Sequence, residues 1–201
     1  NSDSINEAKR RLAGLKYGKG KDITFNTGDL SKEVLHCKTK FDVITCFFAF
    51  HYFFKNKSSL DTILTSIKNC SKNGTVIILT LLDGDLVRNM KTDNFYIKIG
   101  GSNSVTRSPL VSYLQGVTVF PKGSDNSKKK VYGRELEVYI KSSVLDTPEI
   151  EYIVEPNTLI ERMNSINFDL IDTKLFNQFN YSKFGLSKDE KMYSFINRVF
   201  V

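Results

Sequence analysis

The residues best suited to chemistry lie in the aromatic stretch FAFHYFF, from Phe48 to Phe54. His51 and Tyr52 follow an apolar run that begins at Phe41, and open α/β sheets bind their ligands at the carboxyl ends of such strands. A histidine can donate to a carbonyl oxygen, and a tyrosine ring can pack against a base. Because a lone histidine among phenylalanines is more often a satisfied core residue, it is the position at a strand end that favours a function.

Carboxylates form a second group of candidates. Asp29 follows Gly28 and precedes SerLysGlu, a context typical of a turn or helix N-cap, although a carboxylate can also accept from an exocyclic amine. Glu149, Glu151 and Glu155 form an acidic run that fits an exposed strand as well as a binding site. The residues alone leave these alternatives open.

Composition and charge limit the classes of protein to which this chain can belong. The chain has 201 residues, 40% of them hydrophobic and 25% charged, so we expect one domain with one substantial core. The longest apolar runs, at 41–50 and 75–82, are far shorter than the ~20 residues of a bilayer helix, so no membrane association is expected. The net charge of +7 suits a polyanion-binding surface but also an ordinary soluble one.

The cysteines and histidines argue against a metal centre. Cys37, Cys46 and Cys70 are odd in number and lack the spacing of zinc ligands, and the histidines are His36 and His51. We therefore expect no metal site and favour a reducing compartment.

Hydrophobic periodicity predicts the elements that position these residues. Helices are expected over residues 5–15 and from Ser58 to Asn73. A short strand is expected at 23–25, and the apolar runs at 41–50 and 75–82 predict strands covered on both faces. This alternation predicts a doubly wound α/β sheet.

The second half has a looser pattern. A GlyGly pair at 100–101 and a lysine-rich loop at 123–130 separate strand-like pieces, so this half is predicted to be antiparallel or irregular. A helix is expected to open at Pro156, followed by a strand over 168–176 and a last apolar run over 195–201.

Four blocks of the sequence together resemble one known family. TFNTGDLSKEVL (24–35) and FDVITCFFAFHYFF (41–54) are similar to the FxxADxSKxxL and FDxxxxQFxxHYxF elements of the mRNA cap guanine-N7 methyltransferases. KNGTVIILTLLDGDLV (72–87) and TPEIEYIV (147–154) are similar to that family's next two elements, in the same order. The last block has a form closest to the capping enzymes of poxviruses and African swine fever virus.

The resemblance implies a Rossmann-like class I fold of S-adenosylmethionine-dependent methyltransferases, with a doubly wound, mostly parallel sheet and an antiparallel C-terminal part. Residues 1–201 are expected to belong to the methyltransferase domain, with its first strand, glycine-rich loop and first helices upstream of Asn1. The implied reaction moves the methyl group of S-adenosylmethionine to N7 of the cap guanine of GpppN-RNA and leaves S-adenosylhomocysteine. No general base is needed, because N7 attacks with a lone pair.

The resemblance also implies residues that hold the cofactor. Asp29 matches the acid that holds the adenine amino group, and the backbone beside it, at Leu30, can read the ring edge. Tyr52 is expected to pack against the reacting methionine arm. Phe47 stands where the family usually has a glutamine that shapes the cofactor pocket, and a phenylalanine cannot make that contact.

Four residues are implied at the cap guanine. His51 is expected to donate to the guanine carbonyl beside Tyr52, and Glu151 matches a glutamate that can accept both donors of the guanine Watson–Crick edge. A negative charge there also favours the cationic N7-methylguanine. Asn197 stands where the closing strand often carries a tyrosine.

The viral members of the family imply a setting. We expect capped RNA as partner, guanylyltransferase and RNA triphosphatase domains on the same polypeptide, and a location in the viral factories of the host cytoplasm or in the virion. Two alternatives stay open, a non-catalytic stimulatory subunit of a capping enzyme and a small-molecule methyltransferase. Retention of Asp29, His51, Tyr52 and Glu151 together favours the cap-methylating enzyme.

Overall fold

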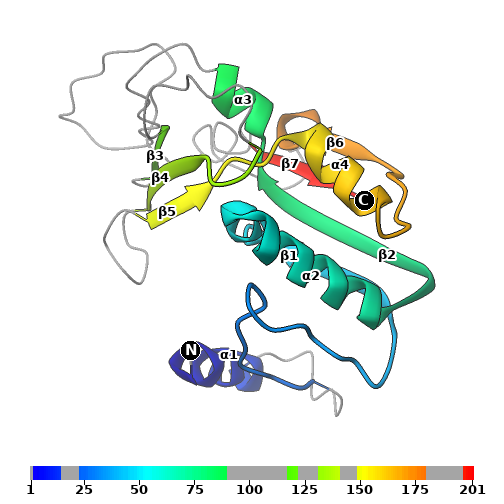
Figure 1. The fold of residues 1–201 in the computed structure, drawn as a ribbon. Helices are drawn as coiled ribbons and strands as arrows, with labels where there is room; N and C mark the ends of the chain where they lie inside the picture. Colours follow the sequence, from blue (N-terminus) through cyan, green and yellow to red (C-terminus); the bar gives the residue numbers. More distant parts are fainter. Residues whose placement is uncertain (1, 15–22, 90–116, 122–130, 141–148, 180–196) are drawn as a thin grey trace.

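The computed structural model describes residues 2–14, 23–89, 117–121, 131–140, 149–179 and 197–201 (Figure 1). Its helices are α1 (Ser2–Gly14), η1 (Phe50–Lys55), α2 (Lys57–Cys70), α3 (Gly84–Asn89), α4 (Pro156–Asn164) and η2 (Phe176–Gln178). Its strands are β1 (Phe41–Phe47), β2 (Ser71–Leu82), β3 (Val117–Pro121), β4 (Glu135–Ile140), β5 (Glu149–Tyr152), β6 (Thr173–Leu175) and β7 (Asn197–Phe200). Helices and strands are mixed along the chain, as expected of an α/β protein.

The strands form two sheets. β1 and β2 pair in parallel, and β7 lies antiparallel between β2 and β6, which gives the order β1-β2-β7-β6. β3, β4 and β5 form a separate antiparallel sheet. The described parallel pairing therefore lies early in the chain and the antiparallel pairings involve its second half, as the sequence predicted.

The core lies where α2 packs along the four-stranded sheet (Figure 1). The predicted apolar stripe of α2, formed by Leu60, Ile63, Leu64 and Ile67, is buried. The other buried members of this core come from η1, β2, the segment before α4, α4 itself and β7: Phe50, Phe54, Ile77, Leu79, Leu81, Val154, Leu159 and Phe200. Full burial of such a side chain contributes roughly 1.5–3 kcal/mol. The shared core thus fixes η1 relative to the strands.

β1 is covered on one face only, which corrects the prediction of a strand covered on both. Ile44 and Cys46 pack against the core, whereas Phe41, Val43 and Phe47 are 48%, 53% and 55% exposed. The reason is that β1 is an edge strand of the described sheet and α2 packs against one of its faces (Figure 1).

Two shorter predictions are also corrected. Residues 23–25 form no strand, because they join neither sheet of the described chain, and Ile23 is 50% exposed. The strand expected over 168–176 is limited to β6, since the chain enters a 3-10 helix at Phe176. The glycine pair at 100–101 and the lysine-rich loop at 123–130 lie outside the described residues.

Cys37 and Cys70 form a disulfide, with the sulfur atoms 1.98 Å apart, whereas Cys46 is free. The bond ties the loop before β1 to the end of α2. Among the described residues, no group of three or more His, Cys, Asp or Glu side chains is placed to hold a metal ion. No helix in the described ranges is long and apolar enough to cross a membrane.

Candidate active site

The aromatic stretch singled out in the sequence turns sharply after β1. Phe48 has a left-handed backbone conformation, with φ of 52°, and its N–H donates to the carbonyl oxygen of Thr80 at 2.7 Å. The chain then forms η1, in which His51 is only 3% exposed and Tyr52 is 39% exposed. Both residues therefore follow the carboxyl end of β1, where the sequence placed them.

β5 supplies carboxylates that meet η1. Glu149 and Glu151 are two positions apart in this strand, so their side chains share one face. Nε2 of His51 lies 3.3 Å from Oε2 of Glu151. The hydroxyl of Tyr52 donates to Oε2 of Glu149 at 3.2 Å, and the His51 and Tyr52 ring centroids are 4.2 Å apart. These four side chains are called the His51 cluster below.

Burial determines the protonation of the His51 cluster. It lowers the pKa of His51 to about 4, because the imidazolium is disfavoured away from water. Burial, followed by the charge of Glu149, raises the pKa of Glu151 to about 7. Burial and the two carboxylates also raise the pKa of Tyr52. At neutral pH His51 is therefore uncharged, and Glu151 is near the midpoint of its titration.

The polar atoms of His51 are not satisfied within the described chain. Both ring nitrogens are buried there without a hydrogen-bond partner, since the nearby Glu151 oxygen is close to Nε2 but not aligned with it. Leaving a buried polar group unsatisfied costs roughly 1–3 kcal/mol. A histidine held in this state at a strand end is suited to bind a ligand.

Asp29 and Leu30 lie in the turn before β1. Oδ1 of Asp29 accepts from the N–H and the hydroxyl of Ser31, at 3.1 and 2.5 Å, and Oδ2 lies 2.9 Å from Nζ of Lys32. These contacts hold the pKa of Asp29 at about 2, with the Ser31 hydroxyl the largest cause. Leu30 packs against the core. The turn role that the sequence allowed for Asp29 is thus present, and its side chain stays ionised and exposed.

Phe47 and Asn197 occupy different strands. Phe47 ends β1 opposite Thr80 of β2, with an exposed ring. Asn197 begins β7 opposite Leu82 and is fully buried. The structure therefore brings together His51, Tyr52 and Glu151 of the predicted site residues.

Glu149 was not singled out from the sequence as a site residue. It was considered only as part of the acidic run that supplied Glu151. The signal that identifies it is the spacing of two residues from Glu151, which in a strand places both side chains on one face.

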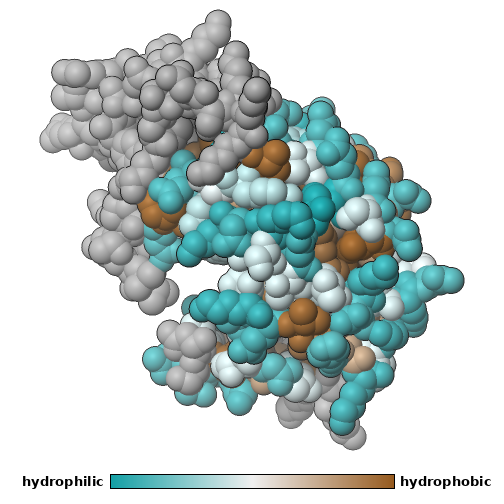
Figure 2. Space-filling view, in the orientation of Figure 1, coloured by the Kyte–Doolittle hydropathy of each residue, from teal (hydrophilic) through white to brown (hydrophobic). Residues whose placement is uncertain are grey.

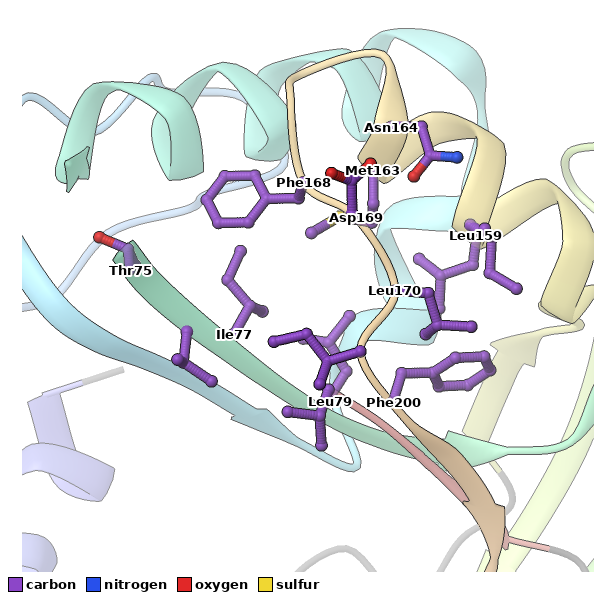
Figure 3. Close-up of a pocket in the computed structure, with 14 residues that line it drawn as sticks. Thr75, Ile77, Leu79, Leu159, Met163, Asn164, Phe168, Asp169, Leu170 and Phe200 are labelled. Carbon is purple, nitrogen blue, oxygen red and sulfur yellow. The ribbon is translucent and has the colours of Figure 1, made fainter. Parts of the chain in front are cut away.

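An apolar cavity lies elsewhere in the fold, between β2, α4 and the segment that follows α4 (Figure 3). Its volume is about 60 Å³, whereas ligand pockets usually measure roughly 300–1,000 Å³. Ile77, Leu79, Leu159, Phe168 and Phe200 are among the side chains that surround it (Figure 3). The cavity contains no predicted site residue and is a packing gap in the core.

Comparison with known sequences gives these residues a family context. A sequence model of the mRNA (guanine-N(7))-methyltransferase domain matches residues 2–198. The chain is 26% identical to the mRNA cap guanine-N(7) methyltransferase of Schizosaccharomyces pombe, over 86% of this chain and 46% of that protein. It is 28% identical to the mRNA-capping enzyme catalytic subunit of Fowlpox virus, over 71% of this chain and 14% of that protein. It thus spans less than half the length of either relative.

Solved structures similar to this chain include methyltransferases. An S-adenosylmethionine-dependent methyltransferase from Clostridium acetobutylicum aligns over 100% of this chain and 70% of its own, with 12% identity and a TM-score of 0.54. The CcbJ methyltransferase of Streptomyces caelestis aligns over 98% and 68%, with 11% identity and a TM-score of 0.58. At this identity the likeness concerns the fold, and it confirms the predicted class I methyltransferase architecture.

Proposed function

This chain belongs to the mRNA (guanine-N7)-methyltransferase family, and we propose that it methylates N7 of the cap guanine of GpppN-RNA with S-adenosylmethionine as methyl donor. The observation that carries the proposal is the His51 cluster, where a buried histidine with unsatisfied ring nitrogens lies between a carboxylate and an exposed aromatic ring. Guanine offers a carbonyl acceptor, two neighbouring donors and a flat ring, so the cluster matches it group by group.

Glu151 is the proposed guanine-selecting residue. Its carboxylate can accept from both donors of the guanine Watson–Crick edge, which adenine does not offer. Because Glu151 is largely buried, a base that left it unpaired would lose the hydrogen bonds that offset its desolvation. A ring N–H of His51 can donate to the guanine carbonyl, and Tyr52 can cover the face of the ring.

The proposed chemistry depends on orientation and charge. N7 of guanine attacks with a lone pair and has no proton to lose, so the site needs no general base. Holding the guanine in line corresponds to an effective molarity of ~10⁵ to 10⁸ M, or roughly 7 to 11 kcal/mol. Guanine gains positive charge as the N7–methyl bond forms, and the negative charge of Glu151 favours that change.

Residues at the carboxyl end of β1 and in the turn before β1 fit a methyl donor of this kind. S-adenosylmethionine, when bound, supplies an electrophilic methyl group on a sulfonium. Phe47 and Tyr52 present exposed aromatic surface that can cover its apolar parts. Asp29 stays ionised and exposed, so its carboxylate can accept an additional amine donor. Leu30 follows it in the same turn, and its backbone is the proposed contact for the adenine edge.

The test is methyl transfer by the full-length protein. We expect label from methyl-labelled S-adenosylmethionine to appear at N7 of guanine in GpppA-capped RNA, identified after nuclease digestion. The matched ApppA-capped RNA should stay unlabelled, because adenine does not offer two donors to Glu151. Equal labelling of both RNAs, or of neither, would contradict the proposal.

We propose a viral origin, guanylyltransferase and RNA triphosphatase domains on the same polypeptide, and a location in cytoplasmic viral factories and virions. Support comes from the similarity to the Fowlpox virus capping-enzyme subunit. A full-length protein that forms no covalent guanylate adduct with labelled GTP would contradict the presence of a guanylyltransferase domain. A nuclear location in infected cells would contradict the proposed location in cytoplasmic viral factories.

A further inference from the structure

We propose that Glu149 is a positioning residue, which holds the ring of Tyr52 in the orientation that the site needs. The inference deepens the proposed function, on which it rests, because it concerns how the same site is kept in order. Glu149 acts in this proposal through Tyr52 and makes no contact with substrate.

The contacts of Tyr52 define its orientation from both ends. The hydroxyl donates to Oε2 of Glu149 at 3.2 Å. The ring packs against the ring of His51, with centroids 4.2 Å apart and planes inclined by 53°. His51 in turn lies 3.3 Å from Glu151. The two rings are therefore held between two glutamates of the same strand, β5. A ring held at its tip and at its side has little freedom left in its two torsions.

The need for such an anchor follows from exposure. Tyr52 is 39% exposed, whereas its neighbour His51 is almost fully buried. An aromatic ring at the surface can change rotamer within nanoseconds unless a contact holds it. Glu149 provides that contact from β5, whose position is fixed by its pairing with β4, with Glu149 opposite Val138 and Glu151 opposite Leu136.

Glu155, the third glutamate of the acidic run, has a purely structural contact with which Glu149 can be compared. Glu155 forms an ion pair with Arg134, which is buried. Glu149 is instead bonded to an aromatic hydroxyl of the proposed site, and it lies on the face of β5 that carries Glu151. Glu149 therefore contacts Tyr52, whereas Glu155 neutralises a buried positive charge.

The test is a double-mutant cycle in the full-length protein, with GpppA-capped RNA as substrate. Glu149→Ala and Tyr52→Phe should each lower kcat/KM about tenfold, mostly through kcat, and the double variant should be no worse than either single one. Glu149→Gln should stay within about threefold of wild type, because its amide oxygen still accepts from the hydroxyl. Glu135→Ala, an exposed change on the neighbouring strand β4, is the control and should not alter kcat/KM.

Three results would overturn the inference: a Glu149→Ala variant as active as wild type, losses that multiply in the double variant, or a Glu149→Gln variant as impaired as Glu149→Ala. If wild type transfers no methyl group, the proposed function fails by itself. The cycle is then measured on the thermal unfolding midpoints, where non-additive shifts support the Glu149–Tyr52 contact and additive shifts overturn it. The same midpoints identify any variant that has lost its fold.

Discussion

The buried contact between His51 and Glu151 should make cap binding depend on pH. With a pKa of about 7, Glu151 is increasingly protonated below neutrality and then accepts the guanine donors poorly, while His51, with a pKa of about 4, stays neutral. Since the ionised fraction of Glu151 grows about tenfold from about pH 6 to about pH 8, affinity for GpppA should rise by up to that factor. Calorimetry across this range measures it.

Glu151→Gln is the control for this pH dependence, because an amide does not titrate. Its affinity for GpppA should be low and nearly constant over the same range. A wild-type affinity that does not change with pH, or a Glu151→Gln variant with the wild-type slope, would show that another group titrates.

Single residues also show how far sequence reasoning reaches. FAFHYFF and the EYIV block selected His51, Tyr52 and Glu151. The fold brings these side chains together although α2, β2, α3, β3 and β4 lie between them in the sequence. Their catalytic roles stay predictions. The near-complete burial of His51 and the bond from Tyr52 to Glu149 depend on where β5 lies against η1, which the residue types do not specify.

At the scale of elements, the start of α3 packs closely against the chain that follows β5. The N–H of Gly84 donates to the carbonyl oxygen of Val154 at 3.1 Å, and a Cβ at Gly84 would lie 2.1 Å from that oxygen. Gly84→Ala must therefore push the two segments apart. We expect the free energy of unfolding, from denaturant titration, to fall by about 2 kcal/mol or more.

Gly28→Ala is the matched control for that substitution, because a Cβ at Gly28 would meet no atom within 4 Å. Its free energy of unfolding should change by less than about 0.5 kcal/mol. Equal effects of the two substitutions would contradict the close approach seen at Gly84.

The elements differ in how well their sequences predicted them. α2 followed from its apolar stripe, although it spans Lys57–Cys70 rather than the predicted range from Ser58 to Asn73. The side chain of Asn56 caps its start by accepting from the N–H of Ser59 at 2.8 Å. The sequence correctly predicted that β1 is a strand, but it did not predict that one face of the strand is exposed. A continuous apolar run indicates that both faces favour burial, and it does not specify what covers them.

At the scale of the whole molecule, the exposed face of β1 is the feature that most needs an explanation. We propose that further chain of the full-length protein, including the expected first helices, packs there. The exposed side chains of Phe41, Val43 and Phe47 support this, as does the greater length of the solved methyltransferases, of which the chain covers 68–70%.

Val43→Asp in the full-length protein tests this covering. If further chain buries the position, an unpaired carboxylate there should lower the free energy of unfolding by about 2 kcal/mol or more. Ile171→Asp is the control, since Ile171 is 73% exposed and shortly precedes β6, which is at the opposite edge of the sheet from β1. A loss below about 0.5 kcal/mol for Val43→Asp would mean that the face of β1 stays in water.

In the proposed site, Glu151 recognises the cap guanine while other residues hold the methyl donor. The most direct measurement compares Glu151→Ala with wild type in the full-length protein, by calorimetry with S-adenosylhomocysteine and by methyl transfer to GpppA-capped RNA. We predict that affinity for S-adenosylhomocysteine stays within about threefold and that transfer falls at least about a hundredfold, as for other removed electrostatic groups. Unchanged transfer by Glu151→Ala would contradict the account.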